Sequence, residues 1–261
     1  MPNVASCPLC ASMQSTHLHT GDKGSGYRDF FHCLECDMVF VPRSQILPPE
    51  AQKARYLEHN NEVDDPAYRD FLFRLYGPMK PYLRDGSTGL DYGAGPGPAL
   101  AAMIREDGYD ICVYDPFFHP DERVLEGAYD FITCTETAEH FTEPARDFHR
   151  LDGLLKPGGW LGVMTGMLKD WSDFPSWYYH RDPTHVNFYS HRTMKWIASR
   201  YGWHALFPEQ NVALFQKRTT KKLSQNGHGG AQRGTTPSGK EGPQGVFSPA
   251  LLKYCVTFDL P

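Results

Sequence analysis

The amino-acid sequence predicts an α/β fold in which a mostly parallel sheet is covered by helices on both faces. Between residues 88 and 218, short apolar runs alternate with amphipathic stretches, the pattern of strands connected by helices. The last two apolar runs, WHALF and NVALFQ, are close enough to form an antiparallel hairpin at or near one edge of that sheet. Ahead of this region, the first 41 residues hold two Cys-x2-Cys pairs, which indicate a small additional module.

The N-terminal third contains this module and a connector. In the module, the strand-like sequences FFHC and MVFV lie on either side of the second cysteine pair. The polar, proline-marked connector, residues 42–84, is expected to form one helix over residues 49–60 and another from Pro66 to about Leu75. Asp65 is the expected N-cap of the second helix, because its carboxylate can accept free amide hydrogens and proline is favoured at the first helical position.

The expected elements of residues 85–218 have clear boundaries. Helices are predicted over residues 98–106, 144–155 and 191–201, and strands over residues 88–93, 110–115, 129–136, 160–165, 203–207 and 211–216. Proline begins the first two helices and Ser190 caps the third. Glycine follows the last turn of each helix, at Gly108, in the sequence KPGG and at Gly202.

The composition changes after Arg218. Residues 219–247 are rich in glycine and contain almost no large apolar side chains, so we expect them to be disordered. The predicted organisation is a zinc-ribbon-like module at 1–41, a helical connector or cap at 42–84, an α/β domain at 85–218 and a tail at 219–261.

Charge and apolar content argue against several classes of protein. The chain of 261 residues is 40% hydrophobic, enough for a substantial core, and carries a formal net charge of −5. Lys23 and Arg28 are the only lysine and arginine in residues 1–41, so nucleic-acid binding is not expected. No run approaches the roughly 20 apolar residues that span a bilayer, and the first residues lack the features of a signal peptide. We therefore expect a soluble, cytoplasmic protein.

The two cysteine pairs, Cys7-x2-Cys10 and Cys33-x2-Cys36, have the spacing of a four-thiolate zinc site. Four thiolates leave no open coordination position, so such a zinc ion would be structural and would stabilise a module too small for a large core. His32 is an alternative ligand, although Cys33 beside it is better placed. A set of unligated thiols is the alternative without a metal.

The glycine-rich sequence LDYGAGPG lies between a predicted strand and a predicted helix and has features of a nucleotide-like ligand site. Backbone can approach a ligand closely where side chains are absent or small, at Gly93, Ala94, Gly95 and Gly97. The following helix N-terminus offers amide donors. Asp91 can accept hydrogen bonds or attract a cationic group. Asp115 ends the next strand, 24 residues later, where an acid can bind both hydroxyls of a ribose.

Together with later segments, this loop resembles the motifs of class I S-adenosylmethionine-dependent methyltransferases, which have a Rossmann-like fold. The matching segments occur in the family's order: LDYGAGPG at 90–97, Tyr114-Asp115, YDFITCTETAEH at 129–140 and LKPGG at 155–159. The resemblance implies S-adenosylmethionine as cofactor, with its methionine part over the 93–97 loop and its ribose on Asp115. It also implies that Thr135 and Glu136 face the reacting centre. The CPLC…HCLEC segment resembles a zinc-binding segment found ahead of some of these enzymes, including ones acting on sugars and other small metabolites.

The chain departs from the family's pattern after Asp115. Only 13 residues separate Asp115 from Tyr129, where the family usually has a helix, a third strand and another helix. The acid that usually lies beside the adenine amino group has no obvious counterpart, and Asp121 or Glu122 could substitute for it. We therefore expect a shortened or remodelled adenine pocket.

Methyl transfer from a sulfonium is an in-line displacement, so the protein mainly positions the acceptor and removes its proton. Histidine suits that base because its ordinary pKa is near neutrality. His140, after the strand at 129–136, and His185, in the aromatic-rich segment SWYYHRDPTHVNFYS, are both predicted to be catalytic. His180 is a further candidate. The alternative roles are a helix cap or a backbone hydrogen bond for His140, and a brace to Asp182 for His185.

The sequence leaves the acceptor open. A small metabolite or a glycosyl group is favoured, because the aromatic side chains of residues 176–190 suit a flat or sugar-like molecule. Two alternatives are a non-catalytic module that senses the cofactor while the zinc segment binds protein or RNA, and a methyltransferase with a macromolecular acceptor. The acceptor atom and the oligomeric state are not predicted.

Overall fold

The computed structural model describes residues 5–58 and 62–219, and its largest element is a sheet of six strands. The strand order is β5 (Asp110–Tyr114), β4 (Thr88–Tyr92), β6 (Tyr129–Thr135), β7 (Leu155–Met164), β10 (Val212–Gln216) and β9 (His204–Glu209). The first four strands are parallel, whereas β10 is antiparallel to both β7 and β9. The predicted fold class, a mostly parallel Rossmann-like sheet with a terminal antiparallel hairpin at one edge, is therefore confirmed.

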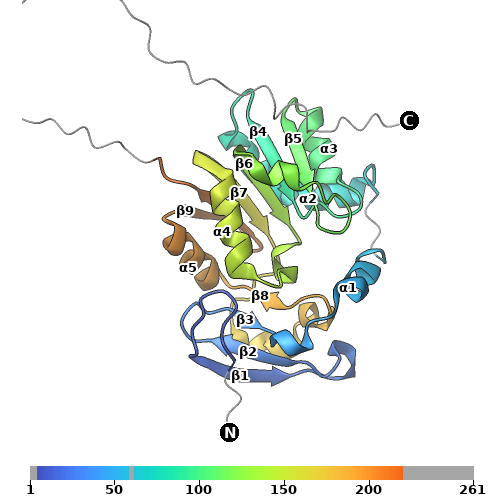
Figure 1. Cartoon of the computed structure of the whole chain (residues 1–261), viewed down its shortest axis with the longest axis vertical. Coiled ribbons are helices and arrows are strands. Elements are labelled where there is room, and N and C mark those ends of the chain that lie inside the picture. The colour runs from blue at the N-terminus through green and yellow to red at the C-terminus, as the bar shows by residue number, and fades with distance from the viewer. Residues whose placement is uncertain (1–4, 59–61, 220–261) are drawn as a thin grey trace, which may run out of the picture.

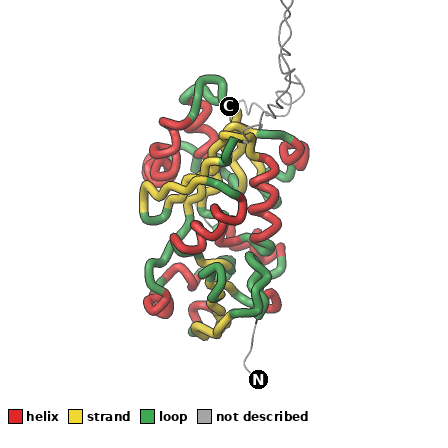
Figure 2. Tube along the Cα trace, turned by 90° about the vertical axis from the view of Figure 1, so that its left-hand side faces the viewer, coloured by secondary structure: helices red, strands yellow, loops and turns green. Residues whose placement is uncertain are grey.

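Helices cover both faces of this sheet (Figures 1 and 2). On one face lie α2 (Pro66–Met79) and α3 (Ala99–Glu106), and on the other lie α4 (Pro144–Leu154) and α5 (His191–Tyr201). Successive side chains of a strand point to opposite faces, so Phe131 enters the core beneath α2 and α3 while Ile132 enters the core beneath α4 and α5. The near-continuous apolar strands of the sequence follow from this double burial.

Helix starts agree with the local sequence signals, but the ends of α1 (Pro49–Tyr56), predicted over 49–60, and of α2 differ from the predictions. Asp65 caps α2 by accepting a hydrogen bond from the Ala67 amide at 2.8 Å, and Ser190 begins α5 with a capping box. Helix α2 runs four residues beyond the predicted end at Leu75, because burial of Tyr76 and Met79 against the sheet outweighs the proline at 78.

Helix α4 ends at Leu154, close to the predicted end, but the sequence KPGG forms the first part of β7, which begins at Leu155 and not at the predicted residue 160. Gly159 explains why glycine is needed there. A Cβ atom on Gly159 would come within 2.8 Å of the Asp130 carbonyl oxygen and 2.9 Å of the Lys156 carbonyl oxygen. These glycines let the strand pass close to its neighbour, so glycine here marks close packing and not a turn alone.

A second, smaller sheet joins the cysteine module to the methyltransferase-like half of the chain. Its strand order is β1 (Ser15–Thr20), β2 (Asp29–Cys33), β3 (Val39–Phe40) and β8 (Asn187–Phe188), all antiparallel. Strand β8 comes from the long segment between β7 and α5 and lies beside β3 in Figure 1. The module therefore packs as part of one body: Phe31 and Met38 share a core with Met194 and Ile197 of α5.

The segment after β5 is short, as predicted. Asp115 and His119 form an isolated antiparallel bridge, and a 3-10 helix over Glu122–Glu126 leads into β6. No strand or α-helix lies between β5 and β6, both of which are fully described. β5 is consequently an edge strand, and the shortened segment borders the ends of the parallel strands.

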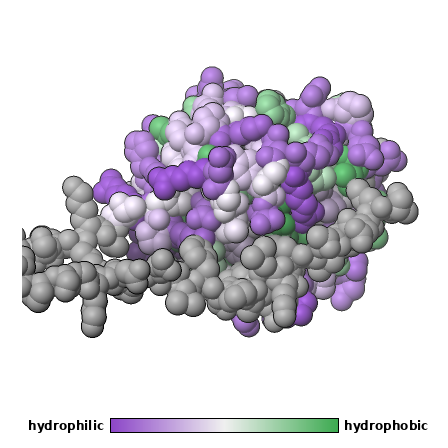
Figure 3. All heavy atoms as spheres, turned by 90° about the horizontal axis from the view of Figure 1, so that it is seen from above, coloured by the Kyte–Doolittle hydropathy of each residue, from purple (hydrophilic) through white to green (hydrophobic). Residues whose placement is uncertain are grey.

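The face seen in Figure 3 is mostly hydrophilic, with apolar side chains in small separate groups. None of the helices in the described ranges has the length and apolar character needed to cross a membrane. The predicted disordered tail lies, apart from residue 219, outside the described residues.

Candidate functional site

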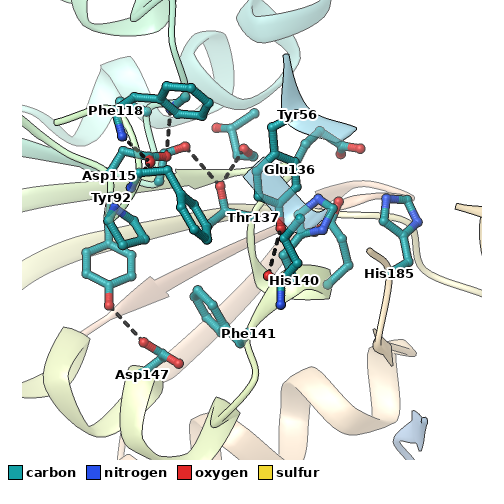
Figure 4. Close-up of a pocket in the computed structure, with 18 of the residues that line it drawn as sticks. Tyr56, Tyr92, Asp115, Phe118, Glu136, Thr137, His140, Phe141, Asp147 and His185 are labelled. Carbon is teal, nitrogen blue, oxygen red and sulfur yellow. Dashed lines mark hydrogen bonds between the residues drawn. The ribbon is translucent and has the colours of Figure 1, made fainter. Parts of the chain in front are cut away.

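A pocket of about 1080 Å³ lies at the carboxyl ends of β4, β5 and β6. The carboxyl edge is where open α/β sheets bind their ligands, because loops leaving neighbouring strands diverge there. In Figure 4, Asp115 and Tyr92 lie at one end of the pocket, His140 and His185 at the other, and Thr137 between them. The pocket is long enough to have two distinct ends with different chemistry.

The glycine loop forms the floor at the Asp115 end. Gly93 has φ +82° and Gly95 has φ +66°, and both line the pocket with Ala94. A Cβ atom on Gly93 would lie 2.1 Å from Cγ2 of Thr137, so a side chain there would force the two loops apart. Glycine at position 93 is therefore required by both backbone conformation and space.

Asp115 fastens this loop to the turn after β5. It is buried, and its Oδ2 accepts a hydrogen bond from the Gly95 amide at 3.1 Å. Its Oδ1 accepts hydrogen bonds from the amides of Phe117 and Phe118 at 2.8 and 3.0 Å. Asp115 also lines the pocket, where the remaining acceptor positions of its carboxylate can bind a ligand hydroxyl.

Asp91 and Gly97, predicted as cofactor-binding residues, are not among the residues that line this pocket. Asp91 is only 4% exposed and accepts a hydrogen bond from Oγ1 of Thr133 at 2.7 Å. Burial raises the pKa of Asp91 to about 6. Asp91 thus lies beneath the loop and supports the strand that carries it.

The end of β6 contributes two predicted residues. Oγ1 of Thr135 is buried and has no hydrogen-bond partner within the described part of the chain, although Thr135 lines the pocket. Glu136 has φ +46°, an unusual conformation for a residue with a side chain, and its amide bonds the Met164 carbonyl at 2.8 Å. An unsatisfied hydroxyl and a strained backbone at the rim of a pocket are features of a ligand site.

Glu136 takes part in a buried acidic network with Glu139. The Tyr179 hydroxyl donates to Glu139 and lies 3.2 Å from Oε2 of Glu136, while Oγ1 of Thr165 donates to Oε2 of Glu139 at 2.8 Å. Burial and the neighbouring Glu139 carboxylate raise the pKa of Glu136 well above its ordinary range. The raised pKa favours the protonated form of Glu136 when the pocket is empty, and a positively charged ligand beside the pair would favour its ionised form.

The structure brings together the two histidines predicted as catalytic. Nδ1 of His140 donates to the Thr184 carbonyl at 3.0 Å, and Nδ1 of His185 donates to the Tyr179 carbonyl at 2.8 Å. A carbonyl can only accept, so each neutral ring keeps its lone pair on Nε2. The two ring centroids are 4.8 Å apart. One polar atom from each histidine and one from Glu139 all lie within 4.8 Å of one another.

The proposed brace between His185 and Asp182 is not formed by side chains. Asp182 instead accepts hydrogen bonds from Thr184 and from Arg55. His185 is largely desolvated, and this burial, with the nearby His140, lowers its pKa to about 4. His185 is therefore a neutral imidazole at pH 7.

His180 lies away from the pocket. Its ring is 2% exposed and packs between Phe30 and Phe174, with centroid separations of 5.4 and 5.2 Å. The position of His180 therefore does not support its candidate role as the base. Of the two candidate acids for the adenine pocket, Glu122 lines the pocket, while Asp121 caps the 3-10 helix and pairs with Arg123.

Sequence reasoning missed the contribution of the connector to the site. Tyr56 of α1 (Pro49–Tyr56) packs on His140, with ring centroids 5.1 Å apart, and on Phe117 at 5.6 Å. Tyr68 of α2 also lines the pocket. The connector forms a wall of the pocket, and the only hint in the sequence was its aromatic content.

The side chains of the four paired cysteines lie close together. Sγ of Cys7 is 3.5 Å from Sγ of Cys36, and Sγ of Cys10 is 3.5 Å from Sγ of Cys33. A tetrahedral zinc ion with Zn–S bonds of about 2.3 Å needs sulfur separations of roughly 3.8 Å. None of the four is in a disulfide, and His32 is not in this group, because its Nε2 bonds Asp37 at 3.0 Å. The arrangement suits a structural ion.

A glycine loop after the first strand of the parallel sheet, an acid after the second and a pocket at the carboxyl edge define a class I S-adenosylmethionine-dependent methyltransferase. The chain belongs to the family described as "Methyltransferase domain", which it matches over residues 59–206, more than half of its length.

Among known proteins, the chain is similar to ubiquinone biosynthesis O-methyltransferases. That of Sodalis glossinidius is 35% identical over 78 residues, which are 29% of this chain and 31% of that protein. That of Erwinia tasmaniensis is 35% identical over 78 residues, 29% of this chain and 32% of the other. The match therefore spans about a third of the length of these relatives.

Two solved structures are also similar. A 1,6-didemethyltoxoflavin-N1-methyltransferase from Burkholderia thailandensis is 13% identical with a TM-score of 0.44, covering 72% of this chain and 98% of its own. A SAM-dependent methyltransferase from Archaeoglobus fulgidus is 16% identical with a TM-score of 0.44, covering 57% of this chain and 94% of its own.

Proposed function

We propose that this enzyme methylates a hydroxyl oxygen of a small, flat acceptor, that His140 accepts the hydroxyl proton, and that His185, whose pKa is lowered to about 4, orients the hydroxyl. The observation that carries the proposal is the pair of imidazoles at one end of the pocket, each with Nδ1 bonded to a carbonyl and the Nε2 lone pair left over. A hydroxyl is weakly acidic and needs a base as its oxygen attacks, whereas an enzyme for a neutral amine has less need of one.

The cofactor end of the pocket is assigned to the glycine loop. When bound, S-adenosylmethionine supplies a methyl group activated by its sulfonium. Gly93, Ala94 and Gly95 would support it with exposed backbone, and Asp115 would bind its ribose hydroxyls. Gly97 and Asp91 would contribute through the position of the loop, since neither lines the pocket.

Residues at the centre of the pocket suit a cationic ligand. The Thr135 hydroxyl has an unused hydrogen-bonding position there, and Glu136 and Glu139 place negative charge beside it. A buried acidic pair is more stable beside a positive charge than alone, which favours binding of a sulfonium. Thr135 and Glu136 are therefore proposed as cofactor-binding residues.

The histidines would act as the acceptor oxygen attacks. The proton of the acceptor hydroxyl passes to Nε2 while the new oxygen–carbon bond forms and the sulfur–carbon bond breaks. Nδ1 keeps its proton on the carbonyl, which holds the ring in the required tautomer. Because the two rings are adjacent, one holds the proton and the other orients the hydroxyl.

The acceptor end is lined by aromatic side chains, which favours a phenol or another flat molecule. Tyr56 packs on His140 and Tyr179 on His185, and both tyrosines line the pocket. The similar ubiquinone biosynthesis O-methyltransferases are named for oxygen methylation, which supports an oxygen acceptor. A glycosyl hydroxyl would undergo the same chemistry and is the second candidate, because aromatic faces also stack on sugars.

We also propose that Cys7, Cys10, Cys33 and Cys36 hold one structural zinc ion. The sulfur separations close to those of a tetrahedral site support this assignment.

The function is tested by methyl transfer from labelled cofactor to panels of phenols and sugars, in the parent enzyme and in His140→Ala and His185→Ala. The expected result is transfer to a phenol, with turnover lowered roughly 10²–10⁴-fold in a base variant and cofactor affinity unchanged. His204→Ala, at an exposed position of β9, is the control.

Two outcomes would contradict the assignment. Full turnover in both histidine variants would remove the base. The other outcome is turnover that requires an added divalent cation in the parent and loses this requirement in the variants. That result would show that the histidines bind a metal ion together with Glu139, whose polar atoms are close enough to theirs.

A further inference from the structure

Arg28, in the loop before β2, makes an unusual set of contacts with the segment that carries His185. Its side chain is buried, with 6% exposed, although arginine is among the residues least often found inside proteins. Nε donates to the Ser25 carbonyl at 3.0 Å within the module. The two terminal nitrogens donate to four carbonyls of one loop, those of His180, Asp182, Pro183 and His185, at 2.8, 2.7, 3.0 and 2.8 Å. All five N–H groups of the guanidinium are thereby used.

The loop at 180–185 needs such a partner because it has little regular structure of its own. A 3-10 helix ends at Arg181 and the two-residue strand β8 begins at Asn187. Four carbonyls pointing to one place cannot pair with each other, and leaving them buried without donors would be costly. A planar guanidinium presents its donors as a fixed fork, which an ammonium group does not reproduce.

The same loop carries functional atoms of the pocket on its other side. His185 turns its ring toward His140, and the Thr184 carbonyl accepts the Nδ1 proton of His140. The Arg28 contacts therefore hold the backbone on both sides of Thr184, whose carbonyl orients His140, and the backbone of His185 itself. The Ser25 contact ties this whole arrangement to the cysteine module.

We propose that Arg28 is a positioning residue for the acceptor end of the active site, through which the N-terminal module sets the orientation of His140 and His185. The proposal rests on the proposed role of the two histidines. It makes the module a part of the catalytic pocket, reached through one side chain.

The test compares Arg28→Lys and Arg28→Gln with Lys23→Gln, a matched control. Lys23 lies in the same loop, is exposed and carries the same charge. Each full-length variant is measured for cofactor affinity by calorimetry, for kcat and acceptor KM, and for the side-chain ¹⁵N resonances and titration of His185. The His185 resonances are identified by their absence in His185→Asn.

In Arg28→Gln we expect kcat to fall 10- to 100-fold and the His185 pKa to rise from about 4 toward its ordinary value as the loop opens to water. Cofactor affinity should change less than twofold, because the glycine loop lies at the other end of the pocket. Arg28→Lys keeps the charge but not the fork, so it should lose most of the same turnover. Lys23→Gln should match the parent.

Three results would overturn the proposal. One is a folded Arg28→Gln with parental kcat and His185 resonances. Another is loss of cofactor affinity in parallel with kcat, which would indicate general disruption. The third is full activity in Arg28→Lys, which would show that only the positive charge of Arg28 matters and not its planar guanidinium. If Arg28→Gln does not fold, Arg28→Lys alone tests the proposal. Should both His140→Ala and His185→Ala retain full turnover, the proposed function fails, but the His185 resonances still report separately whether Arg28 positions the ring.

Discussion

Gly93 illustrates how a single residue sets the geometry of the cofactor end. Its φ of +82° lies in the region that favours glycine, and its amide bonds the Tyr114 carbonyl at 2.7 Å, so the loop cannot easily shift. Thr137, whose Oγ1 donates to the Gly93 carbonyl at 3.1 Å, fills the space where a side chain would be.

We expect Gly93→Ala to weaken cofactor binding at least tenfold, or about 1.4 kcal/mol. The added methyl group would collide with Thr137 and displace the loop. Gly86→Ala is the control, because Gly86 has a similar φ of +75° but open space around it. Calorimetry should show a loss of affinity in the first variant alone; equal affinities in both would contradict the role of the loop.

His185 makes the stability of the protein depend on pH. Its pKa is lowered from the model-peptide value of 6.5 to about 4 by burial and by His140, against the opposing charges of Glu139 and Asp182. Between these two pH values, the unfolded chain therefore binds a proton on His185 and the native protein does not. This contribution to stability is fully present above pH 6.5 and is lost as the pH falls toward 4.

We expect the parent to lose about 2 kcal/mol more of unfolding free energy than His185→Asn between pH 7.5 and pH 5, measured by urea denaturation. The raised pKa values of Asp91 and Glu136 act in the opposite direction, so the difference between the two proteins, and not the parent's own profile, is the measurement. Parallel profiles would show that His185 is not held neutral.

At the scale of elements, the pocket is assembled from segments that are far apart in the chain. Helix α1 supplies Tyr56, the end of β6 supplies Glu136, and the loop before β8 supplies His185. Arg55 of α1 bonds Asp182 at 3.0 Å, so the connector and the loop hold each other in place.

For the whole molecule, the two sheets and the cysteine cluster behave as one packed body. Cys33 and Cys36 belong to the same buried cluster as Tyr189 and Met194, and Ser190 at the start of α5 donates to Asp37. The predicted boundary at residue 41 separates the four-cysteine segment from the rest of the sequence. In the folded protein, the same boundary divides one continuous core.

We expect one zinc ion per chain by elemental analysis, and a single cooperative unfolding transition. Cys36→Ser or removal of the ion by a chelator should lower the Tm of that one transition, because the core beside the cysteines is shared with α5. Zinc added back should restore the parent but not Cys36→Ser. A separate early transition, or protein purified without chelators that contains no zinc, would contradict this view.

Much of the fold was predictable because its signals are local. The strand–helix alternation, the caps at Asp65 and Ser190 and the glycine loop each depend on a few adjacent residues whose backbone preferences act over short distances. Cysteine spacing is likewise a local signal. For this reason the class of enzyme, the loop and the cysteine group could be identified from the chain alone.

The tertiary structure decided what local patterns cannot encode. Asp91 looked like a ligand residue because it ends a strand, yet its side chain is buried against Thr133. His180 and His185 lie five residues apart in one loop, but only His185 reaches the pocket. The partners that separate them, Arg28 and Phe30 among them, come from the N-terminal module. Long-range packing determines which side of a loop faces a site. In this protein that packing is between the two sheets, and it cannot be read from a local stretch of sequence.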